Sequence, residues 1–323
     1  MNKLVLVDGN AIVHRAYHAL PPLNKTEDGQ LTNAVYGFFS MVLKITADLA
    51  PDHLVVCFDR AAPTFRKQMF SGYQATRPKM DEGLSGQFKI IREVLDKVKI
   101  CVFDLDGYEA DDLIGTLARQ ATEQSAVSNQ QSDNQVVILT GDRDMLQLVN
   151  HRVLILAPII GVTKMILFDP EKVKEKYLVP PSRFVDYKAL IGDSSDNYPG
   201  VGGIGPKTAA DLVNKFGTLE EIYQNLGEVS PRISEKLATD AEQAVMAKKL
   251  ATIEVNAPIH LKFSDCEVKN IDRSALLSEF EELNFNSLIA RFKLDQKPSA
   301  AAKVKMDKKV KQEQEKENQL GLL

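Results

Sequence analysis

The chain has 323 residues, a length that accommodates about two domains of ordinary size. Hydrophobic residues make up 44% and charged residues 26%, which favours a packed core and excludes a wholly disordered chain. No stretch approaches the roughly 20 apolar residues that a membrane span needs, and the apolar start at Leu4–Val7 is too short for a signal peptide. The three cysteines lie far apart and predict neither a disulfide framework nor a zinc site, which is typical of the cytoplasm.

The net charge of −4 argues at first against a nucleic-acid partner, because such proteins usually carry basic patches. Acids that surround divalent metal ions, however, do not repel DNA as bare acids do. The net charge therefore leaves a nucleic-acid partner open.

The first 170 residues alternate apolar runs rich in Val and Ile with longer amphipathic stretches. The amphipathic stretches include 34–47 and 87–98, and both have the period of a helix. This alternation predicts a mostly parallel sheet with covering helices. The runs expected to form strands are 4–7, 54–58, 100–103, 136–139 and 153–156.

From about Asp169 the pattern becomes helical, with Gly and Pro marking turns and helix starts. We therefore expect an α/β domain over 1–170 and a smaller helical domain over 171–294. Residues 295–323 are rich in Lys, Glu, Gln and Ala, and this composition predicts a flexible charged tail.

Nine acidic residues follow the expected strands or lie early in the helical region. In a parallel sheet the carboxyl ends of the strands face one crevice, so most of these side chains should converge there. Clustered carboxylates need a counter-ion, and oxygen ligands without His or Cys suit Mg²⁺ or Mn²⁺. Two such ions can activate water and stabilise the leaving oxygen of a phosphodiester. The acids are Asp8, Asp59, Glu109, Asp111, Asp112, Asp142, Asp144, Asp193 and Asp196.

A structural explanation exists for each acid taken singly. Asp111 or Asp112, for example, could cap the helix that follows it. The nine acids lie in five segments of the chain. Acids from so many segments that converge on one site are much harder to explain as helix caps, so the pattern favours a metal site.

A glycine-rich segment, Gly200–Ala210, precedes a helix that should run to about Phe216. Its glycines permit close approach of a phosphate backbone, and amides at a helix start can bind phosphate. The spacing matches neither a P-loop nor a dinucleotide-binding motif. An ordinary glycine-rich helix connection is the alternative.

The segment 63–79 interleaves basic and aromatic side chains directly after Asp59. Aromatic rings can stack on bases while cations hold phosphates. A solvated basic helix face is the alternative. The side chains concerned are Phe65, Arg66, Lys67, Phe70, Tyr73, Arg77 and Lys79.

Together these elements resemble the 5′-nuclease superfamily, specifically the 5′–3′ exonuclease (flap endonuclease) domain of bacterial DNA polymerase I. The resemblance covers about residues 1–290 and rests on the order and spacing of five motifs. The motifs are Val7-Asp8-Gly9-Asn10 with Arg15-Ala16-Tyr17, Cys57-Phe58-Asp59, Gly107-Tyr108-Glu109-Ala110-Asp111-Asp112, Thr140-Gly141-Asp142-Arg143-Asp144, and Ile191-Gly192-Asp193-Ser194-Ser195-Asp196-Asn197 with the glycine segment.

The resemblance implies a PIN-like α/β core, a helical arch at about 63–88 and a helix-three-turn-helix DNA-binding domain. It implies that all nine acids bind two divalent ions, directly or through water, and that Gly202–Gly205 holds K⁺ against duplex DNA. Arg66 and Arg77 would be catalytic residues near the scissile phosphate. The implied DNA-binding residues are Arg15, Tyr73, Gln74, Lys79, Gly202, Gly203, Gly205, Lys207 and Thr208.

One departure from the family pattern concerns the arch. The family usually reads Tyr-Lys-Ala-x-Arg, whereas this chain reads Tyr73-Gln74-Ala75-Thr76-Arg77. Gln74 cannot supply the positive charge of that lysine. We therefore expect a slower enzyme, and a faster one when Gln74 is replaced by Lys.

No polymerase region follows in these 323 residues, so we expect a DNA polymerase that acts in trans. The final residues, Gln319–Leu323, resemble the short peptide by which bacterial proteins dock on the sliding clamp. A chance apolar terminus, or the cut end of a longer chain, is the alternative. We expect a monomer in the cytoplasm, associated with the nucleoid.

The sequence therefore predicts a Mg²⁺- or Mn²⁺-dependent 5′–3′ exonuclease and flap endonuclease. Its substrate would be a 5′-flap or nicked DNA duplex, hydrolysed by two-metal-ion catalysis in primer removal and repair. The alternatives are a non-catalytic, structure-specific DNA-binding module and a PIN-like ribonuclease. The first should have lost some of the acids, and the second should lack the glycine segment, Asp193 and Asp196.

Overall fold

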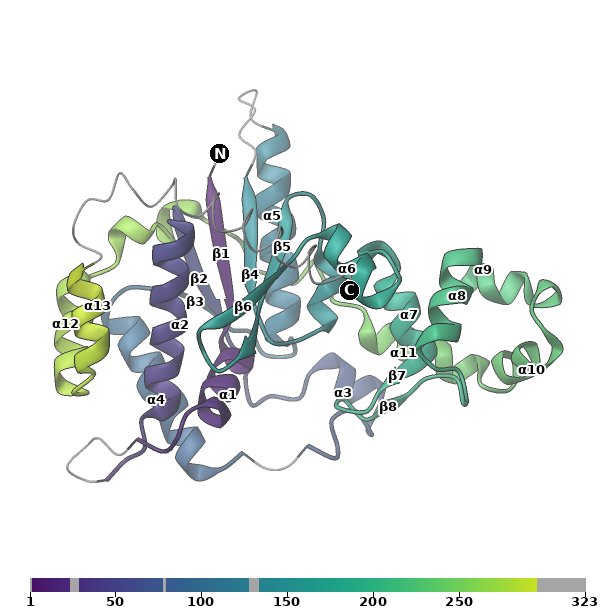
Figure 1. Ribbon diagram of the computed structural model, residues 1–323, viewed down its shortest axis with the longest axis horizontal. Coiled ribbons are helices and arrows are strands. Elements are labelled where there is room, and N and C mark those ends of the chain that lie inside the picture. Colours follow the sequence, from purple (N-terminus) through teal and green to yellow (C-terminus); the bar gives the residue numbers. More distant parts are fainter. Residues whose placement is uncertain (1, 24–28, 78–79, 128–133, 295–323) are drawn as a thin grey trace, which may run out of the picture.

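The computed structural model describes residues 2–23, 29–77, 80–127 and 134–294, and within them a six-stranded sheet forms the centre (Figure 1). The strand order is β3-β2-β1-β4-β5-β6, and only the β5–β6 pair is antiparallel. This mostly parallel sheet with covering helices confirms the predicted α/β fold class. The strands are β1 (Lys3–Asp8), β2 (His53–Cys57), β3 (Cys101–Phe103), β4 (Gln135–Leu139), β5 (Val153–Ile160) and β6 (Lys164–Phe168).

Helices cover both faces of the sheet. Val5 and Val7 of β1 pack in one hydrophobic cluster with α1 (Gly9–Ala19), α2 (Asn33–Leu49) and α4 (Glu82–Lys97). Leu4 and Leu6 point the other way and pack with α5 (Ala110–Val127). Because successive side chains of a strand alternate between faces, a strand covered on both sides is apolar throughout, which is why β1 was recognisable in the sequence.

The edge strand β6 was not predicted. Its burial alternates only weakly, and it begins with the exposed Lys164. It pairs with β5 in a hairpin that leaves Ile160 63% exposed, so neither a continuous apolar run nor a clean alternation marks it.

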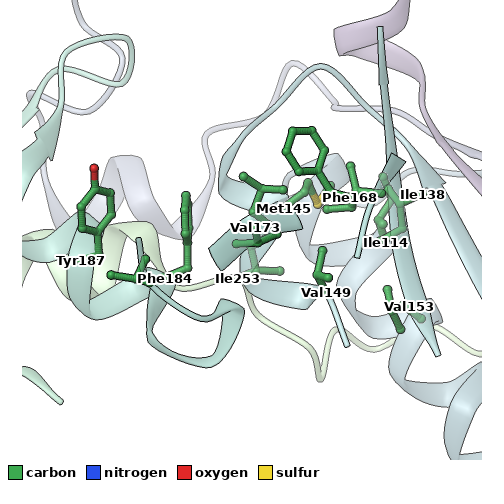
Figure 2. Packing of buried hydrophobic residues seen from close by; sticks show 14 of the residues in the cluster. Ile114, Ile138, Met145, Val149, Val153, Phe168, Val173, Phe184, Tyr187 and Ile253 are labelled. Carbon is green, nitrogen blue, oxygen red and sulfur yellow. The ribbon is translucent and has the colours of Figure 1, made fainter. Parts of the chain in front are cut away.

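The predicted helical region, as far as residue 251, projects to one side of the sheet (Figure 1). It is anchored by a hydrophobic cluster that runs from Ile138 of β4 through Val173 to Phe184 and Tyr187 (Figure 2). The expected boundary between residues 170 and 171 therefore lies inside a continuous core. The helices are α6 (Pro170–Tyr177), α7 (Phe184–Ile191), α8 (Pro206–Phe216), α9 (Leu219–Gln224), α10 (Pro231–Thr239) and α11 (Ala241–Ala251), with the small hairpin β7 (Gly192–Asp193) and β8 (Tyr198–Pro199).

The last two described helices, α12 (Arg273–Glu282) and α13 (Asn286–Leu294), return to the sheet. The Phe280 ring lies 5.6 Å from that of Phe39 in α2, and Tyr36 packs edge-on against Phe285. This end of the expected 171–294 domain therefore packs on the α/β unit.

The described parts of the expected arch, 63–77 and 80–88, lie below the carboxyl ends of the strands (Figure 1). They contain the short helix α3 (Phe65–Met69), a series of turns and the first two turns of α4. Short 3₁₀ segments complete the described chain: η1 (Asp144–Leu148), η2 (Pro181–Arg183), η3 (Leu226–Glu228), η4 (Phe263–Asp265) and η5 (Val268–Asn270).

Candidate metal centre and nucleic-acid interface

The direction of the strand order reverses at β1, whose two neighbours are β2 and β4. In sheets of this kind the crevice at such a reversal is where ligands bind. Asp8 is the last residue of β1, Asp59 follows β2, and Asp142 follows β4, so the sheet itself brings three of the predicted acids to one edge.

Asp8 is 3% exposed, and its carboxylate accepts two hydrogen bonds. One carboxylate oxygen accepts from the amide of Ala11 at 2.9 Å, and the other accepts from the Thr140 hydroxyl at 2.6 Å. Burial raises the pKa of Asp8 to about 7; the two hydrogen bonds oppose this, and the negative charges of Asp142 and Asp59 add to it.

Asp111 and Asp142 are carboxylates with raised pKa values, like Asp8. Burial raises the pKa of both groups, and Asp142 is the next largest cause for Asp111. The ion pairs among the described residues include none to Asp8, Asp111 or Asp142 within 4 Å. We call these three residues the floor group.

The floor group fits a hard divalent cation. Its donors are oxygen atoms only, which is the set that Mg²⁺ and Mn²⁺ prefer. Mutual repulsion and burial keep the carboxyl pKa values high, and a cation would relieve exactly that repulsion by neutralising the ionised forms.

Glu109 and Asp112 form a second group, which we call the Arg66 rim. The Arg66 guanidinium reaches Asp112 through two bonds of 2.7 and 2.8 Å and Glu109 at 3.4 Å. It also donates to the carbonyl oxygens of Leu250 and Thr252 at the end of α11. Arg66 is only 2% exposed, so all of its described contacts are within the protein.

Burial raises the pKa of Glu109 to about 7, although Arg66 opposes the shift. Asp112 is fully buried and also accepts from the amides of Glu109 and Glu254. The Arg66 rim therefore ties the start of α5 to α3 and to the end of α11.

Asp144, Asp193 and Asp196 form the third group, in which one oxygen from each lies within 4.8 Å of the others. We call them the outer triad. Lys188 of α7 lies between them, with its ammonium 2.6 Å from Asp144 and paired with Asp193. Burial raises the pKa of Asp144 to about 7 despite Lys188, whereas for Asp193 the bonds from Lys188 and Ser195 outweigh burial and lower the pKa.

The arch contacts the outer triad through two side chains, Arg77 and Gln74. The Arg77 guanidinium lies 2.6 Å from Asp196, and the Gln74 side chain donates to the same oxygen at 3.2 Å. The Gln74 amide also donates to the Asp196 carbonyl, with Gln74 at a φ of 54°. The Arg77 side chain remains 49% exposed, so part of it faces solvent.

Tyr73 is 3% exposed; its hydroxyl donates to Glu109 at 3.1 Å, and its ring stacks on Tyr198. Arg15 donates to the carbonyls of Ile159 near the end of β5 and of Gly161 in the turn that follows it. These two predicted DNA-binding side chains are thus engaged within the protein. Lys79 lies outside the described residues.

The glycine segment leads into α8 as predicted. Gly203 has a φ of 72°, a conformation that favours glycine, while Ile204 is 5% exposed and anchors the turn in the core. The Gly202 amide donates to Asp240, and Lys236 donates to the Gly203 carbonyl at 2.9 Å. Gly202, Gly203, Gly205 and Lys207 are exposed and Thr208 is half-buried, so the segment presents backbone to solvent.

Lys188 and Thr140 are site residues that the sequence reasoning missed. A signal existed for Lys188, because it is a single charge in the otherwise apolar run Tyr187-Lys188-Ala189-Leu190. A lysine buried in such a run must have a carboxylate partner, and Asp193 follows five residues later. No such signal marks Thr140, whose role depends on β1 and β4 being neighbours.

Fold and site together define a class: an α/β protein with a carboxylate cluster at the strand ends and a helical extension. Residues 3–178 match the family model described as "5'-3' exonuclease, N-terminal resolvase-like domain", and residues 179–274 match "5'-3' exonuclease, C-terminal SAM fold". The chain belongs to the 5′–3′ exonuclease family.

Curated relatives include the DNA polymerase I of Bacillus subtilis, 41% identical over 290 residues, which are 90% of this chain and 32% of that protein. The DNA polymerase I of Mycobacterium leprae is 39% identical over 88% of this chain and 30% of its own length. The chain thus spans about a third of the length of the curated relatives it matches.

Among solved structures, phage T5 D15 protein co-crystallised with metal ions superposes with a TM-score of 0.63 at 17% identity, covering 91% of this chain and 98% of that one. The catalytic core of Rad2 in complex with DNA substrate gives 0.58 at 15% identity, covering 90% and 92%. At these identities the superpositions establish the shared fold, including the helical extension. No helix in the described part of the chain is long and apolar enough to cross a membrane.

Proposed function

We propose that this chain is a divalent-metal-dependent 5′–3′ exonuclease and flap endonuclease. It would hydrolyse DNA phosphodiesters near single-strand/duplex junctions, in primer removal and repair. The observation that carries the proposal is the convergence of carboxylates from β1, β2, β4 and α5 on one crevice, in a chain of the 5′–3′ exonuclease family.

The nine acids would hold two Mg²⁺ or Mn²⁺ ions. The floor group would supply ligands to one ion and the outer triad to the other. Asp59, Glu109 and Asp112 would act directly or through water. Bound divalent ions lower the pKa of water and stabilise a leaving oxygen.

The protein's own groups would orient the substrate strand. Arg77 carries a half-exposed guanidinium 2.6 Å from Asp196 of the outer triad and is our candidate to bind the scissile phosphate. Arg66 would act through Glu109 and Asp112, because its described bonds leave it buried. The exposed backbone of Gly202–Gly205, with Lys207 and Thr208, would follow the duplex phosphates, with K⁺ at this turn competing with the Lys236 ammonium for the Gly203 carbonyl.

Residues 1–170 and 171–294 would serve as the nuclease and DNA-binding domains, with a DNA polymerase acting in trans and the protein a cytoplasmic, nucleoid-associated monomer. The clamp peptide, Gln319–Leu323, lies outside the described residues. Pull-down with a bacterial sliding clamp tests it: deletion of these five residues should abolish binding, and equal binding by both chains would overturn that part of the proposal.

A labelled 5′-flap duplex incubated with Mg²⁺ tests the function. Asp142→Ala should lower the single-turnover rate by about 1000-fold or more, while flap binding in Ca²⁺ persists. Asp48→Ala is the matched control, because Asp48 is an exposed acid on α2 that pairs with Lys44 and is not one of the nine predicted acids. Flap binding by the unaltered chain without cleavage in Mg²⁺ or Mn²⁺ would favour a binding module, and cleavage of RNA alone a ribonuclease.

A further inference from the structure

Lys188 is the most deeply buried lysine of the acidic crevice, with 7% of its surface exposed. Three neighbouring residues on α7 are buried in the core: Tyr187, Ala189 and Leu190. Their packing fixes the orientation of α7 and therefore the direction of the Lys188 side chain. Burying an ammonium is costly unless partners compensate for the lost water. Here Asp144 and Asp193 are those partners.

The position of the ammonium coincides with the place where a cation would sit. Oxygens of Asp144, Asp193 and Asp196 lie within 4.8 Å of one another, so side-chain shifts of a few tenths of an ångström would let them share one ion whose bonds to oxygen measure about 2.1 Å. Lys188 already contacts two of these three carboxylates. A divalent ion would therefore meet an ammonium in direct contact with the outer triad, whereas among the described residues the floor group has no ion pair and Lys188 acts on Asp142 only through its charge at longer range.

We propose that Lys188 is a built-in counter-ion of the outer triad that competes with the divalent ion and makes this half of the centre the weaker binder. The inference rests on the proposed function, in which the acids hold two ions. Lys188 is a positioning residue in this account: it holds Asp144 and Asp193 together before the second ion enters, and that ion must displace its ammonium.

Metal titration without substrate tests the proposal. Mn²⁺ binding to the full chain is followed by the electron paramagnetic resonance signal of free Mn²⁺, for wild type, Lys188→Met, Lys188→Gln and Lys188→Arg. Wild type should show a tight and a weak class of site. The two neutral variants should tighten the weak class by about tenfold or more and leave the tight class unchanged, whereas Lys188→Arg should stay weak.

Lys248→Met is the matched control. Lys248 of α11 also bridges two carboxylates, Asp186 at 2.7 Å and Glu220 at 2.6 Å, and neither is one of the nine acids proposed to hold metal. Lys248→Met should leave the Mn²⁺ affinities of both classes of site unchanged. If the Mn²⁺ affinities of both classes of site are unchanged in Lys188→Met and Lys188→Gln, the proposed role of Lys188 is overturned, whereas the metal-dependent function is not. Absence of Mn²⁺ binding in every chain would overturn the proposed metal-dependent function and this inference with it.

A pair of cysteines carries a second, independent inference. The sulfur atoms of Cys101 and Cys266 lie 3.0 Å apart, although 165 positions separate the residues. Both backbones are fixed against β2: Cys101 is the register partner of Val55, and the Cys266 carbonyl accepts from Leu54 at 2.9 Å. The Cys266 thiol donates to Cys101, and this bond lowers the pKa of Cys101.

We propose that Cys101 and Cys266 form a peroxide-reactive dithiol. The Cys101 thiolate attacks hydrogen peroxide, the O–O bond breaks, and hydroxide leaves and is protonated to water, giving a sulfenic acid. The Cys266 sulfur then attacks the Cys101 sulfur; the S–O bond breaks, and a second water leaves with the Cys266 proton. Peroxide is reduced to two waters and the thiols are oxidised to a disulfide, which needs the sulfurs to close by only about 1 Å.

Intact mass and thiol counting after peroxide treatment test this proposal. Of three thiols one should remain, the chain should lose two hydrogens, and a peptide linking Cys101 to Cys266 should appear. Cys101→Ser and Cys266→Ser should each prevent the link, while Cys57→Ser, at a fully buried cysteine, should leave it intact. Three thiols persisting under conditions that oxidise a small dithiol, or a sulfinic acid in place of the link, would overturn the proposal.

Discussion

The floor group and the Arg66 rim place the same kind of side chain in opposite electrostatic settings a few residues apart. Asp111 of the floor group meets other carboxylates, and its pKa is raised well above the usual value, first by burial and then by Asp142. Asp112, its neighbour in sequence, is fully buried but accepts two bonds from Arg66. Within the rim Asp112 is thus paired with a cation of the protein, whereas the acids of the floor group have no ion pair among the described residues.

A neutralised rim and an unneutralised floor group should respond oppositely to substitution. At the rim, removal of the cation leaves buried charges without a partner. On the floor, removal of one acid relieves repulsion. The predictions below test this contrast, beginning with the largest expected effect.

Arg66→Met should lower the free energy of unfolding by about 3–5 kcal/mol, because it leaves Asp112 and Glu109 buried without their cation. Urea denaturation of the EDTA-treated protein measures it. Arg77→Met is the matched control: its side chain is 49% exposed, so the loss should stay below about 1 kcal/mol. Equal losses for the two variants would contradict the distinction between a structural and a substrate-facing arginine.

Asp111→Asn should raise the free energy of unfolding of the EDTA-treated protein at pH 8 by roughly 1–2 kcal/mol, because it removes one of several mutually repelling carboxylates. It should also weaken stabilisation by Mg²⁺. The control is Asp106→Asn, at an acid 64% exposed, with an expected change within about 0.5 kcal/mol. A destabilised Asp111→Asn chain would show that the floor group is held by contacts that outweigh its repulsion.

The pH dependence of stability gives a smaller effect of the same origin. Asp8, Glu109 and Asp144 have pKa values of about 7, above the ordinary values of 3.8 and 4.5. The folded protein thus holds these protons more tightly than the unfolded chain, so their contribution to stability is complete below about pH 4 and is lost as the pH rises through 7.

Thermal unfolding in EDTA should therefore show a Tm that falls between about pH 5 and pH 8. Mg²⁺ should raise the Tm by more at pH 8 than at pH 5.5, because the ion binds the ionised carboxylates. A Tm that rises over this range in EDTA would contradict the raised pKa values.

The sequence was sufficient for those features that depend on local pattern and strand order. Buried parallel strands are apolar runs in the sequence. The acids that follow such strands must share one edge of the sheet, and on this basis the sequence predicts that Asp8 and Asp142 lie close together. The resemblance pointed to Arg66 and Arg77, but the partners of these cations within the protein could not be predicted from the sequence. The bonds of Arg66 with Asp112 and with Leu250, and the proximity of Cys101 and Cys266, join segments whose spacing carries no periodic signal. Three-dimensional packing alone decides which cation meets which acid.

Gln74→Lys tests the arch, where the expected effect is smallest. Gln74 donates to Asp196 beside Arg77, so a lysine at this position would add a positive charge next to the outer triad. We expect a rise of several-fold in the single-turnover rate on a 5′-flap substrate, because an ammonium attracts the phosphate where an amide does not.

Gln74→Met separates the two possible causes of such a rise. It removes the hydrogen bond to Asp196 without adding charge, so a charge effect predicts no gain in its rate. An equal gain in both variants would mean that releasing Asp196 is what matters, and an unchanged or lower rate for Gln74→Lys would contradict the prediction. In that last case the ammonium would be held by Asp196, as Lys188 is held by Asp144, and would never reach the substrate.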